Sequence, residues 1–513
     1  MSQDVARCRE MSRDVGSGGG CGEGTPLQAS MLLALAPLAL LLIGATPAAG
    51  GAPKAAAADA APSIPFERYT LKNGLEVILH QDPRAPLVVV DVWYHVGSGN
   101  EVPGKSGFAH LFEHMMFQGS VHTGRDQHFQ ILSNAGASNI NGTTNSDRTN
   151  YFEIVPENEL ETALWLESDR LGFLLPLLDD AQLKNQIDVV RNERRQRYDN
   201  VPYGKELFAV AAGLYPEGHP YRYMTIGRHE DLEAASVDDV KAFFNTWYTP
   251  RNATLVVAGD IDVPRTRALV ETYFGGLGTG GKGKTLAPSK TAPKMPALTK
   301  TSRTTLEDPF ARLPRVQYAW HSGKFFSDED IDLDVLSMIL GADGWGRLYQ
   351  RLVVQEQLAQ SVDVSENSRG WSSSFHVTAT LKPSSDLAKV EKIIGEELAR
   401  LIKEGPSPAE LLRAKNGLEA SMIFPLDELL ARAERLQSHN HYTGDPGSMP
   451  ALLARYRNTT TTGLQKTAKR VLGRPRIEVV TMPAPATPAP PGPLAPPPSL
   501  PTPPKPAIVG GGQ

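Results

Sequence analysis

Cysteine is nearly absent from this sequence of 513 residues, which has only two, Cys8 and Cys21, both in a Gly-rich leader. The rest of the chain therefore contains neither disulfides nor a cysteine-based metal site or nucleophile, so a transition-metal site there must use His and carboxylate ligands. The sequence also lacks an excess of basic residues, because 52 Lys and Arg stand against 57 Asp and Glu, for a net charge of −5. This balance offers no electrostatic footprint for nucleic acid.

No apolar run in the sequence is long enough to span a bilayer, which takes about 20 helical residues. The one strongly apolar run, residues 31–44, is followed by small residues and fits the middle of a secretory signal peptide, with cleavage near Ala48 or Ala49. The residues before it carry mixed charges instead of a positive charge, which translation starting at Met31 would explain. We therefore expect an exported, periplasmic protein without a membrane span.

The pattern along the rest of the chain predicts two folded domains. Residues 64–273 contain strand and helix patterns without a βαβ rhythm, which predicts the α+β class. A Gly-, Lys- and Pro-rich segment, 274–300, is expected to be an exposed linker. After it, 301–482 repeats the order of a strand followed by a helix, which favours a second domain of like fold. Residues 1–63 are expected to be a leader with the signal peptide and a low-complexity spacer, and 483–513 a Pro-rich disordered tail.

The segment GFAHLFEHMMFQG places His110 and His114 four positions apart, with Glu113 directly before the second histidine. In a helix over 106–118 the two histidines lie one turn apart on one face, where their imidazoles can share one tetrahedral Zn²⁺. Glu113 lies on an adjacent strip, from which its carboxylate can act as general base on water that the metal activates. The alternative is that both are ordinary core or surface histidines. An H-x-x-E-H string arises by chance in about one chain of this length and composition in a hundred.

A catalytic zinc needs a third protein ligand, and the best candidate is Glu193, which lies 79 residues after His114 on a predicted helix. Arg191, Arg194 and Arg195 flank it, so a salt-bridged surface helix explains these residues equally well. The acidic residues of the preceding helix are expected to form its solvated face: Glu157, Glu159, Glu161 and Glu167.

With these residues the sequence resembles the pitrilysin (insulinase) family of zinc metallopeptidases, which combine H-x-x-E-H with a distant ligand glutamate. Six segments in the order of the family carry the resemblance: GFAHLFEHMMFQGS, NGTTNSDRTNYFEIVP, LWLESDRLGFLL, VVRNERRQRYDNVPYG, HPYRYMTIG and YTPRNATLVVAGDID. The likeness runs from about residue 68 to about residue 480 and covers both predicted domains. The likeness is strongest to half-size members similar to mitochondrial processing peptidase and its bacterial relatives.

The resemblance implies tandem α+β domains of like fold, each a mixed, mostly antiparallel sheet packed against helices. It implies one Zn²⁺ per chain, bound by His110, His114 and Glu193. It further implies that Glu113 acts as general base and then as proton donor. Many relatives have a second glutamate seven residues before the ligand glutamate, where this chain has Gln186, an amide that can still hydrogen-bond a ligand or water and tune the site.

Members of the family bind substrate as a strand added to a sheet edge and enclose peptides or unfolded polypeptides in a chamber between two half-size chains. Asn141 and Gly142 match the edge-strand position, so we expect them to contact the substrate backbone. The alternative is that Asn141 only shapes a turn. Active relatives also carry an Arg and a Tyr in the second domain, where this chain has Val353 and Gln360, neither of which can replace them.

These observations predict an exported zinc endopeptidase that is the catalytic subunit of a heterodimer, whose related, inactive partner supplies the Arg/Tyr pair. A homodimer is the second interpretation of the assembly. A non-catalytic structural or assembly subunit of the same family is the alternative function, although its ligand set is normally eroded. A metal-binding module without hydrolysis is a third.

Overall fold

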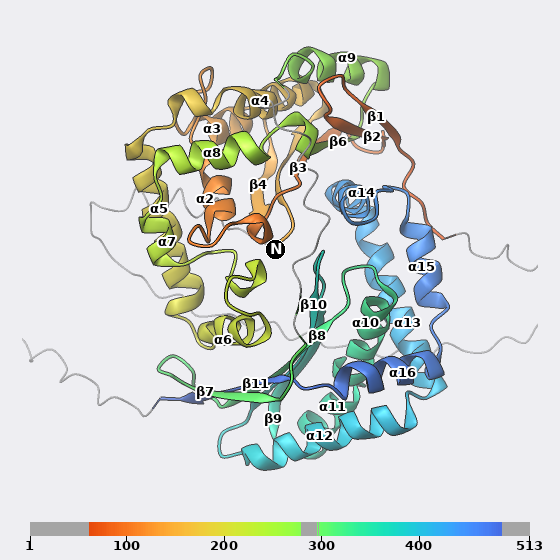
Figure 1. Ribbon diagram of the computed structural model, residues 1–513. Helices are drawn as coiled ribbons and strands as arrows, with labels where there is room; N and C mark the ends of the chain where they lie inside the picture. Colours follow the sequence, from red (N-terminus) through yellow and green to blue (C-terminus); the bar gives the residue numbers. More distant parts are fainter. Residues whose placement is uncertain (1–60, 279–294, 296, 485–513) are drawn as a thin grey trace, which may run out of the picture.

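The computed structural model describes residues 61–278, 295 and 297–484 (Figure 1). Nearly all of the predicted leader with its signal peptide, most of the predicted linker and nearly all of the Pro-rich tail lie outside these residues. The described chain forms two units, a first that ends with α9 (Val263–Phe274) and a second that begins with β7 (Ser302–Asp308). No helix in the described ranges combines the length and the apolarity that crossing a bilayer requires.

The first unit is built on a six-stranded sheet in the order β1-β2-β6-β3-β5-β4. All neighbouring strands are antiparallel except β2 and β6, which are parallel. A turn at Asn73 and Gly74 joins β1 to β2, and Gly74 has a φ of +96°, which residues with a Cβ rarely adopt. The strands are β1 (Glu67–Thr70), β2 (Glu76–Gln81), β3 (Leu87–Tyr94), β4 (Ser138–Thr144), β5 (Thr149–Pro156) and β6 (Ala253–Gly259).

Helices of the first unit pack on one face of this sheet, except α6 (Gly204–Leu214), which lies against the sheet of the second unit. Because side chains alternate along a strand, Val88, Val90 and Val92 of β3 face the helices and join Leu111 and Phe112 in one core. Burial of this apolar face holds the helix with the two motif histidines against the sheet. The helices are α2 (Phe108–Met115), α3 (Gln127–Asn134), α4 (Leu160–Phe173), α5 (Asp180–Arg194), α6, α7 (His229–Glu233), α8 (Val237–Trp247) and α9.

The second unit has a five-stranded sheet in the order β7-β11-β8-β10-β9, in which only the β7–β11 pair is parallel. Both sheets are therefore mixed and mostly antiparallel, which confirms the predicted α+β class with two domains of like fold. The other strands are β8 (Arg315–Ser322), β9 (Ala359–Asn367), β10 (Ser373–Leu381) and β11 (Ile477–Pro483). The helices are α10 (Asp328–Gly341), α11 (Arg347–Tyr349), α12 (Leu387–Glu404), α13 (Pro408–Ile423), α14 (Leu429–Thr443), α15 (Met449–Arg457) and α16 (Thr461–Leu472).

Helix α14 of the second unit covers the other face of the first sheet (Figure 1). Val89 and Val256 of that sheet pack against Ala433 and Leu436 of the helix. Gln437 then donates hydrogen bonds to main-chain carbonyls of β3 and β6, at 2.9 and 3.0 Å. The first sheet is thus buried on both faces, and the second unit supplies part of its cover.

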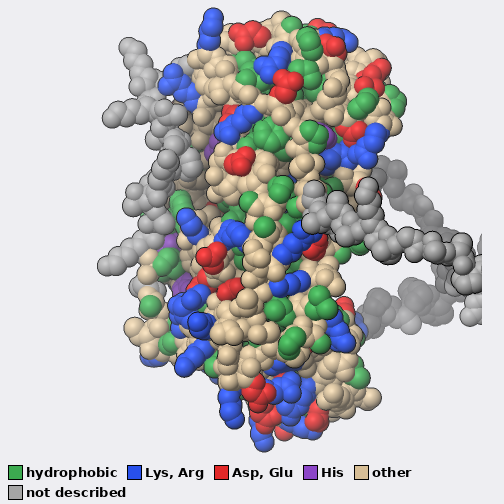
Figure 2. Space-filling view, turned by 90° about the vertical axis from the view of Figure 1, so that its right-hand side faces the viewer, with side chains coloured by type: hydrophobic (Ala, Val, Ile, Leu, Met, Phe, Trp, Pro, Cys, Tyr) green, Lys and Arg blue, Asp and Glu red, His purple; other side chains and the backbone are tan. Residues whose placement is uncertain are grey.

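A second junction lies just after β4, at Asp147. Its carboxylate accepts hydrogen bonds from the hydroxyls of Tyr221 (2.5 Å) and Tyr442 (3.1 Å) and from the backbone N–H of Gly370 (2.9 Å). Tyr442 and Gly370 belong to the second unit, so Asp147 links the end of β4 to it. On the face in Figure 2, basic and acidic side chains are interspersed over both units, in keeping with the nearly balanced charge.

The predicted solvated acidic face covers the short 3-10 helix Glu157–Glu159 and α4, and the prediction is wrong for one residue. Glu157 and Glu161 are exposed and Glu159 is partly exposed, but Glu167 is fully buried. Its carboxylate forms an ion pair with Arg170, one turn further along the helix, which is also buried. Buried charges persist when they are paired in this way, and the partner three residues away on the same face was the available signal.

Candidate metal centre

The helix α2 begins at a fixed point of the chain. Gly107 precedes it with a φ of +89°, a left-handed conformation that favours glycine. The carboxylate of Glu101 accepts hydrogen bonds from the N–H groups of Gly107 (3.0 Å) and Ala109 (2.8 Å), which are among the donors that the helix itself leaves unpaired. This start places His110 and His114 on the same face, directed away from the apolar core.

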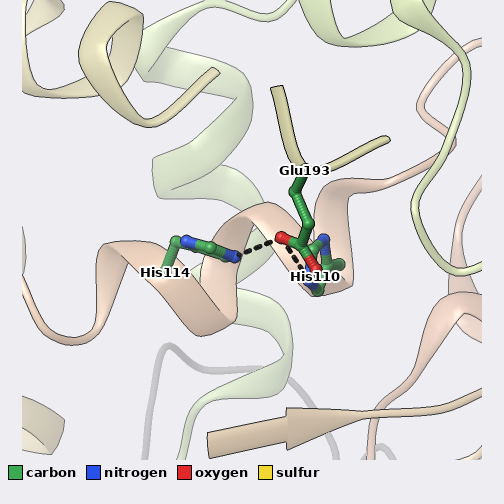
Figure 3. A group of neighbouring side chains, drawn as sticks. All are labelled: His110, His114 and Glu193. Atoms are coloured by element: carbon green, nitrogen blue, oxygen red, sulfur yellow. Dashed lines mark ion pairs between the residues drawn. The ribbon is translucent and has the colours of Figure 1, made fainter. Parts of the chain in front are cut away.

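The side chains of His110, His114 and Glu193 converge (Figure 3). Oε2 of Glu193 lies 3.5 Å from Nε2 of His110 and 3.3 Å from Nε2 of His114. In a tetrahedral zinc site with bonds of 2.0 to 2.2 Å, neighbouring donors are about 3.4 Å apart. These two distances and the chemistry of the three donors therefore suit one zinc ion.

The same three side chains are mostly shielded from water, with 10%, 12% and 13% of their surfaces exposed. Nε2 of His110 is the ring nitrogen directed at Glu193. Nδ1 of the same ring is buried and has no hydrogen-bond partner within the described ranges. Two imidazoles and a carboxylate turned toward a common point leave one tetrahedral position open, as in catalytic zinc sites.

Glu193 sits near the end of α5, which starts with a capping box of Asp179 and Gln182. Oε1 of Glu193 forms an ion pair with Nη1 of Arg197, at 2.7 Å, while Oε2 faces the histidines. Burial raises the pKa of Glu193, but the hydrogen bond from His114 and the neighbouring positive charges outweigh it and lower the pKa to about 2. The carboxylate is therefore ionised and ready to bind a cation.

The three flanking arginines make other contacts. Arg191 pairs with Asp188 and Glu233, Arg194 with Asp199, and Arg195 donates to Asn192. The surface-helix interpretation thus describes the neighbours of Glu193, whereas Glu193 itself turns toward α2. Arg197 was not singled out from the sequence, because an arginine four residues after a glutamate is common on helices.

The carboxylate of Glu113 is buried beside the histidines, with 6% of the residue exposed. Oγ1 of Thr144, in β4, donates a hydrogen bond of 2.6 Å to its Oε2. A Cβ added at Gly142 would lie 3.1 Å from Cγ of Glu113, so the glycine allows the helix and strand to approach closely. Nothing in the sequence pattern identified Thr144, because this contact joins residues 31 positions apart.

The predicted substrate-binding residues Asn141 and Gly142 lie in β4, the last strand of the first sheet. Both are buried as residues, and β4 pairs with β5 on one side only within the described part of the chain. The register of this pair shifts between Ser138 and Asn141. Asn141 therefore belongs to a strand at the sheet edge and not to the turn that follows it.

Gln186 is buried on α5, seven residues before Glu193. Among the described residues its amide makes no hydrogen bond to His110, His114 or Glu193. No direct contact in the described part of the chain therefore supports the suggested role of Gln186.

Val353 and Gln360 belong to the second unit. Val353 packs against the second core, and Gln360 is exposed near the start of β9. The other end of β9 leads to Gly370, which contacts the first unit at Asp147. At about 3.3 Å per residue, seven residues of strand put Gln360 roughly 23 Å from that end. In this chain Val353 and Gln360 thus lie at the end of the second unit that is far from Asp147.

Two family profiles match the sequence. The family described as "Insulinase (Peptidase family M16)" matches residues 76–208, and the one described as "Peptidase M16 inactive domain" matches residues 234–418. The "Zinc protease PqqE" of Helicobacter pylori is 30% identical over 363 residues, which cover 70% of this chain and 80% of that protein. The "Mitochondrial-processing peptidase subunit beta" of Lentinula edodes is 26% identical over 389 residues, which cover 72% and 80%.

Solved structures share the fold. A protease from Helicobacter pylori superimposes with a TM-score of 0.75 at 26% identity, covering 82% of this chain and 100% of that chain. The periplasmic protease PqqL from Escherichia coli superimposes with a TM-score of 0.69 at 17% identity, covering 82% of this chain and 48% of that one. At this lower identity the likeness concerns the fold alone.

Proposed function

The chain belongs to the insulinase family of peptidases (M16), among its half-size zinc proteases, and from this we propose that it is a zinc-dependent endopeptidase. The observation that carries the proposal is the convergence of His110, His114 and Glu193 beside the buried carboxylate of Glu113. A non-catalytic family member has no use for a complete ligand set with a base next to it. The full set therefore favours an enzyme over a structural subunit.

In the proposed mechanism His110, His114 and Glu193 hold one Zn²⁺. When bound, zinc supplies a Lewis acid that lowers the pKa of water to about 7 and polarises a carbonyl oxygen. The carboxylate of Glu113 accepts the proton of the attacking water and then delivers it to the nitrogen of the leaving amine. After both transfers Glu113 is ionised again, so one side chain serves the whole cycle.

The substrates in this proposal are peptides or unfolded polypeptides that bind in extended form. The position of β4 at the sheet edge supports this, because an edge strand offers N–H and C=O groups to an added strand. Asn141 and Gly142 are the proposed contacts. They lie on the same strand as Thr144, which donates a hydrogen bond to Glu113. Binding through the backbone makes the affinity largely independent of side chains, which suits a broad range of peptides.

The proposal includes a partner chain. A developing oxyanion without its hydrogen-bond donor costs roughly 3 to 4 kcal/mol, or two to three powers of ten in rate. Val353 has no donor and Gln360 is a neutral amide, so we infer that a related, inactive subunit supplies an Arg/Tyr pair in a heterodimer that closes around the substrate. A homodimer is the second form of assembly.

The proposed location is the periplasm. The apolar run at 31–44 followed by small residues supports export through a signal peptide. The mature chain would then begin near Ala48 or Ala49.

The substitution Glu113→Gln tests the proposed function. It removes the base but keeps the size of the side chain, so we expect zinc binding to persist and peptide turnover to fall by about 10² to 10⁴-fold. Zinc content by atomic absorption and cleavage of a quenched peptide library measure the two effects.

The matched control is Glu157→Gln, an exposed acidic residue on the first unit, which should keep wild-type activity. Wild-type rates for Glu113→Gln would contradict the mechanism. Zinc-loaded wild-type chain that cleaves no peptide, with or without a related partner, would favour the structural alternative.

A further inference from the structure

The strand β4 holds the carboxylate of Glu113 from one side. Thr144 donates through Oγ1 to Oε2 of Glu113 at 2.6 Å, a short hydrogen bond to a charged acceptor. Oε1 of the same carboxylate has no hydrogen-bond partner in the part of the chain that the structure describes. One oxygen is therefore fixed by the protein, and the other remains for a reacting group.

We infer that Thr144 is the positioning residue for the general base, an inference that rests on the proposed peptidase function. Its O–H fixes the rotation of the Glu113 carboxylate and takes up electron density at Oε2. Proton transfer is thereby directed to Oε1. A carboxylate free to rotate would spend much of its time in orientations that cannot receive the proton.

Gly142 contributes to the same arrangement. It lies two residues before Thr144, so both belong to the same side of the strand. A Cβ at position 142 would meet Cγ of Glu113, the ring of Phe117 and the ring of Tyr151, each at 3.1 Å. The absent side chain lets β4 lie close enough for the hydroxyl of Thr144 to reach the carboxylate. The strand proposed to bind the peptide thus also orients the base.

The neighbouring Thr143 provides the matched comparison. Its hydroxyl donates to Oδ1 of Asn150 at 2.5 Å and accepts from Arg148, so it serves a structural network and not Glu113. Thr143→Val and Thr144→Val remove the same hydroxyl from adjacent positions of one strand. Only the second removes a donor to the base.

The test compares Thr144→Val, Thr144→Ser and Thr143→Val as zinc-loaded full-length chains with the wild type. For Thr144→Val we expect kcat to fall about 10- to 100-fold, less than loss of the base itself, with KM within about twofold and the zinc content unchanged. Thr144→Ser keeps the hydroxyl and should recover kcat to within about threefold of the wild type. Thr143→Val should keep kcat within about threefold even if it lowers the melting temperature.

A crystal structure gives a readout that does not depend on activity. We expect the Glu113 carboxylate in one orientation in the wild type and in Thr144→Ser, and in more than one in Thr144→Val. An unchanged kcat in Thr144→Val, or no recovery in Thr144→Ser, would overturn the inference while leaving the proposed function intact. A zinc-loaded wild type that has no peptidase activity, with or without a related partner, would overturn both.

Discussion

Glu193 contacts two kinds of partner through its two oxygens. Oε2 faces the imidazoles of His110 and His114, while Oε1 is paired with Arg197. An ion pair on the far oxygen fixes the plane of the carboxylate, as outer partners of metal ligands usually do. The ligand is therefore oriented by its own helix end before a metal binds.

We predict that Glu193→Gln removes zinc binding and activity together. The amide loses the negative charge, and zinc affinity should fall by more than about 100-fold, since loss of an outer partner alone costs about 10- to 100-fold. Bound zinc stabilises the folded chain by about 2.7 kcal/mol at a concentration of 100 times Kd. EDTA should therefore lower the melting temperature of the wild type but not that of Glu193→Gln, as differential scanning fluorimetry measures.

Asp188→Asn is the control for this experiment, because Asp188 is an exposed acidic residue on the same helix. It should retain zinc and respond to EDTA like the wild type. If Glu193→Gln bound zinc as tightly as the wild type, the third ligand would have to be another residue.

Between β5, α3 and α4, four buried side chains form a second cluster. Glu153, Glu167 and His128 bring donor atoms within 4.8 Å of one another, and Arg170 pairs with Glu167. These donors alone would suit a cation, but Arg170 already neutralises one carboxylate. A single proton on Glu153 neutralises the other, whereas a divalent ion would leave a buried net positive charge. We therefore expect this cluster to hold a proton and not a metal.

The cluster should make folding stability depend on pH. Burial, and next the charge of Glu167, raise the pKa of Glu153 well above its ordinary value of 4.5. The folded chain then keeps a proton that the unfolded chain releases above about pH 4.5, so this contribution to stability is complete below that pH and is lost as pH rises toward the raised pKa. Glu153→Gln should remove this slope and be relatively more stable at pH 8 than at pH 5.

Urea unfolding of the wild type and Glu153→Gln at several pH values measures this difference. The exposed Glu157→Gln serves as the control and should follow the wild type. A slope that is identical in Glu153→Gln and the wild type would mean that Glu153 is ionised in the folded chain.

Local spacing predicted the elements and the residues that one helix brings together. The four-residue interval correctly places His110 and His114 on one face of α2. Contacts between distant segments were not predictable in the same way. The burial of Glu167 depends on its pairing inside the packed sheet and helix layers, and the bond from Thr144 to Glu113 depends on how closely β4 approaches α2.

At the scale of the whole molecule, several contacts hold the two units together, among them the packing of α6 on the second sheet. α14 covers the first sheet, and Asp147 binds residues of the second unit just beyond β4. This arrangement fixes the second unit relative to the candidate metal centre and leaves Gln360 at the opposite end of β9. This position supports the proposal that the Arg/Tyr pair comes from another chain.

We predict that the purified chain alone cleaves peptides slowly and that a related chain with the Arg and Tyr but without H-x-x-E-H accelerates it. The expected gain is about 10²- to 10³-fold, the worth of the missing oxyanion donors. Peptide turnover measured while the second chain is titrated in should saturate at one partner per chain. With the Glu113→Gln chain the same titration should stay about 10²- to 10⁴-fold below the wild-type pair, since the partner has no zinc site of its own. Full activity of the isolated chain would instead mean that two copies form the enzyme and that Val353 and Gln360 do not limit it.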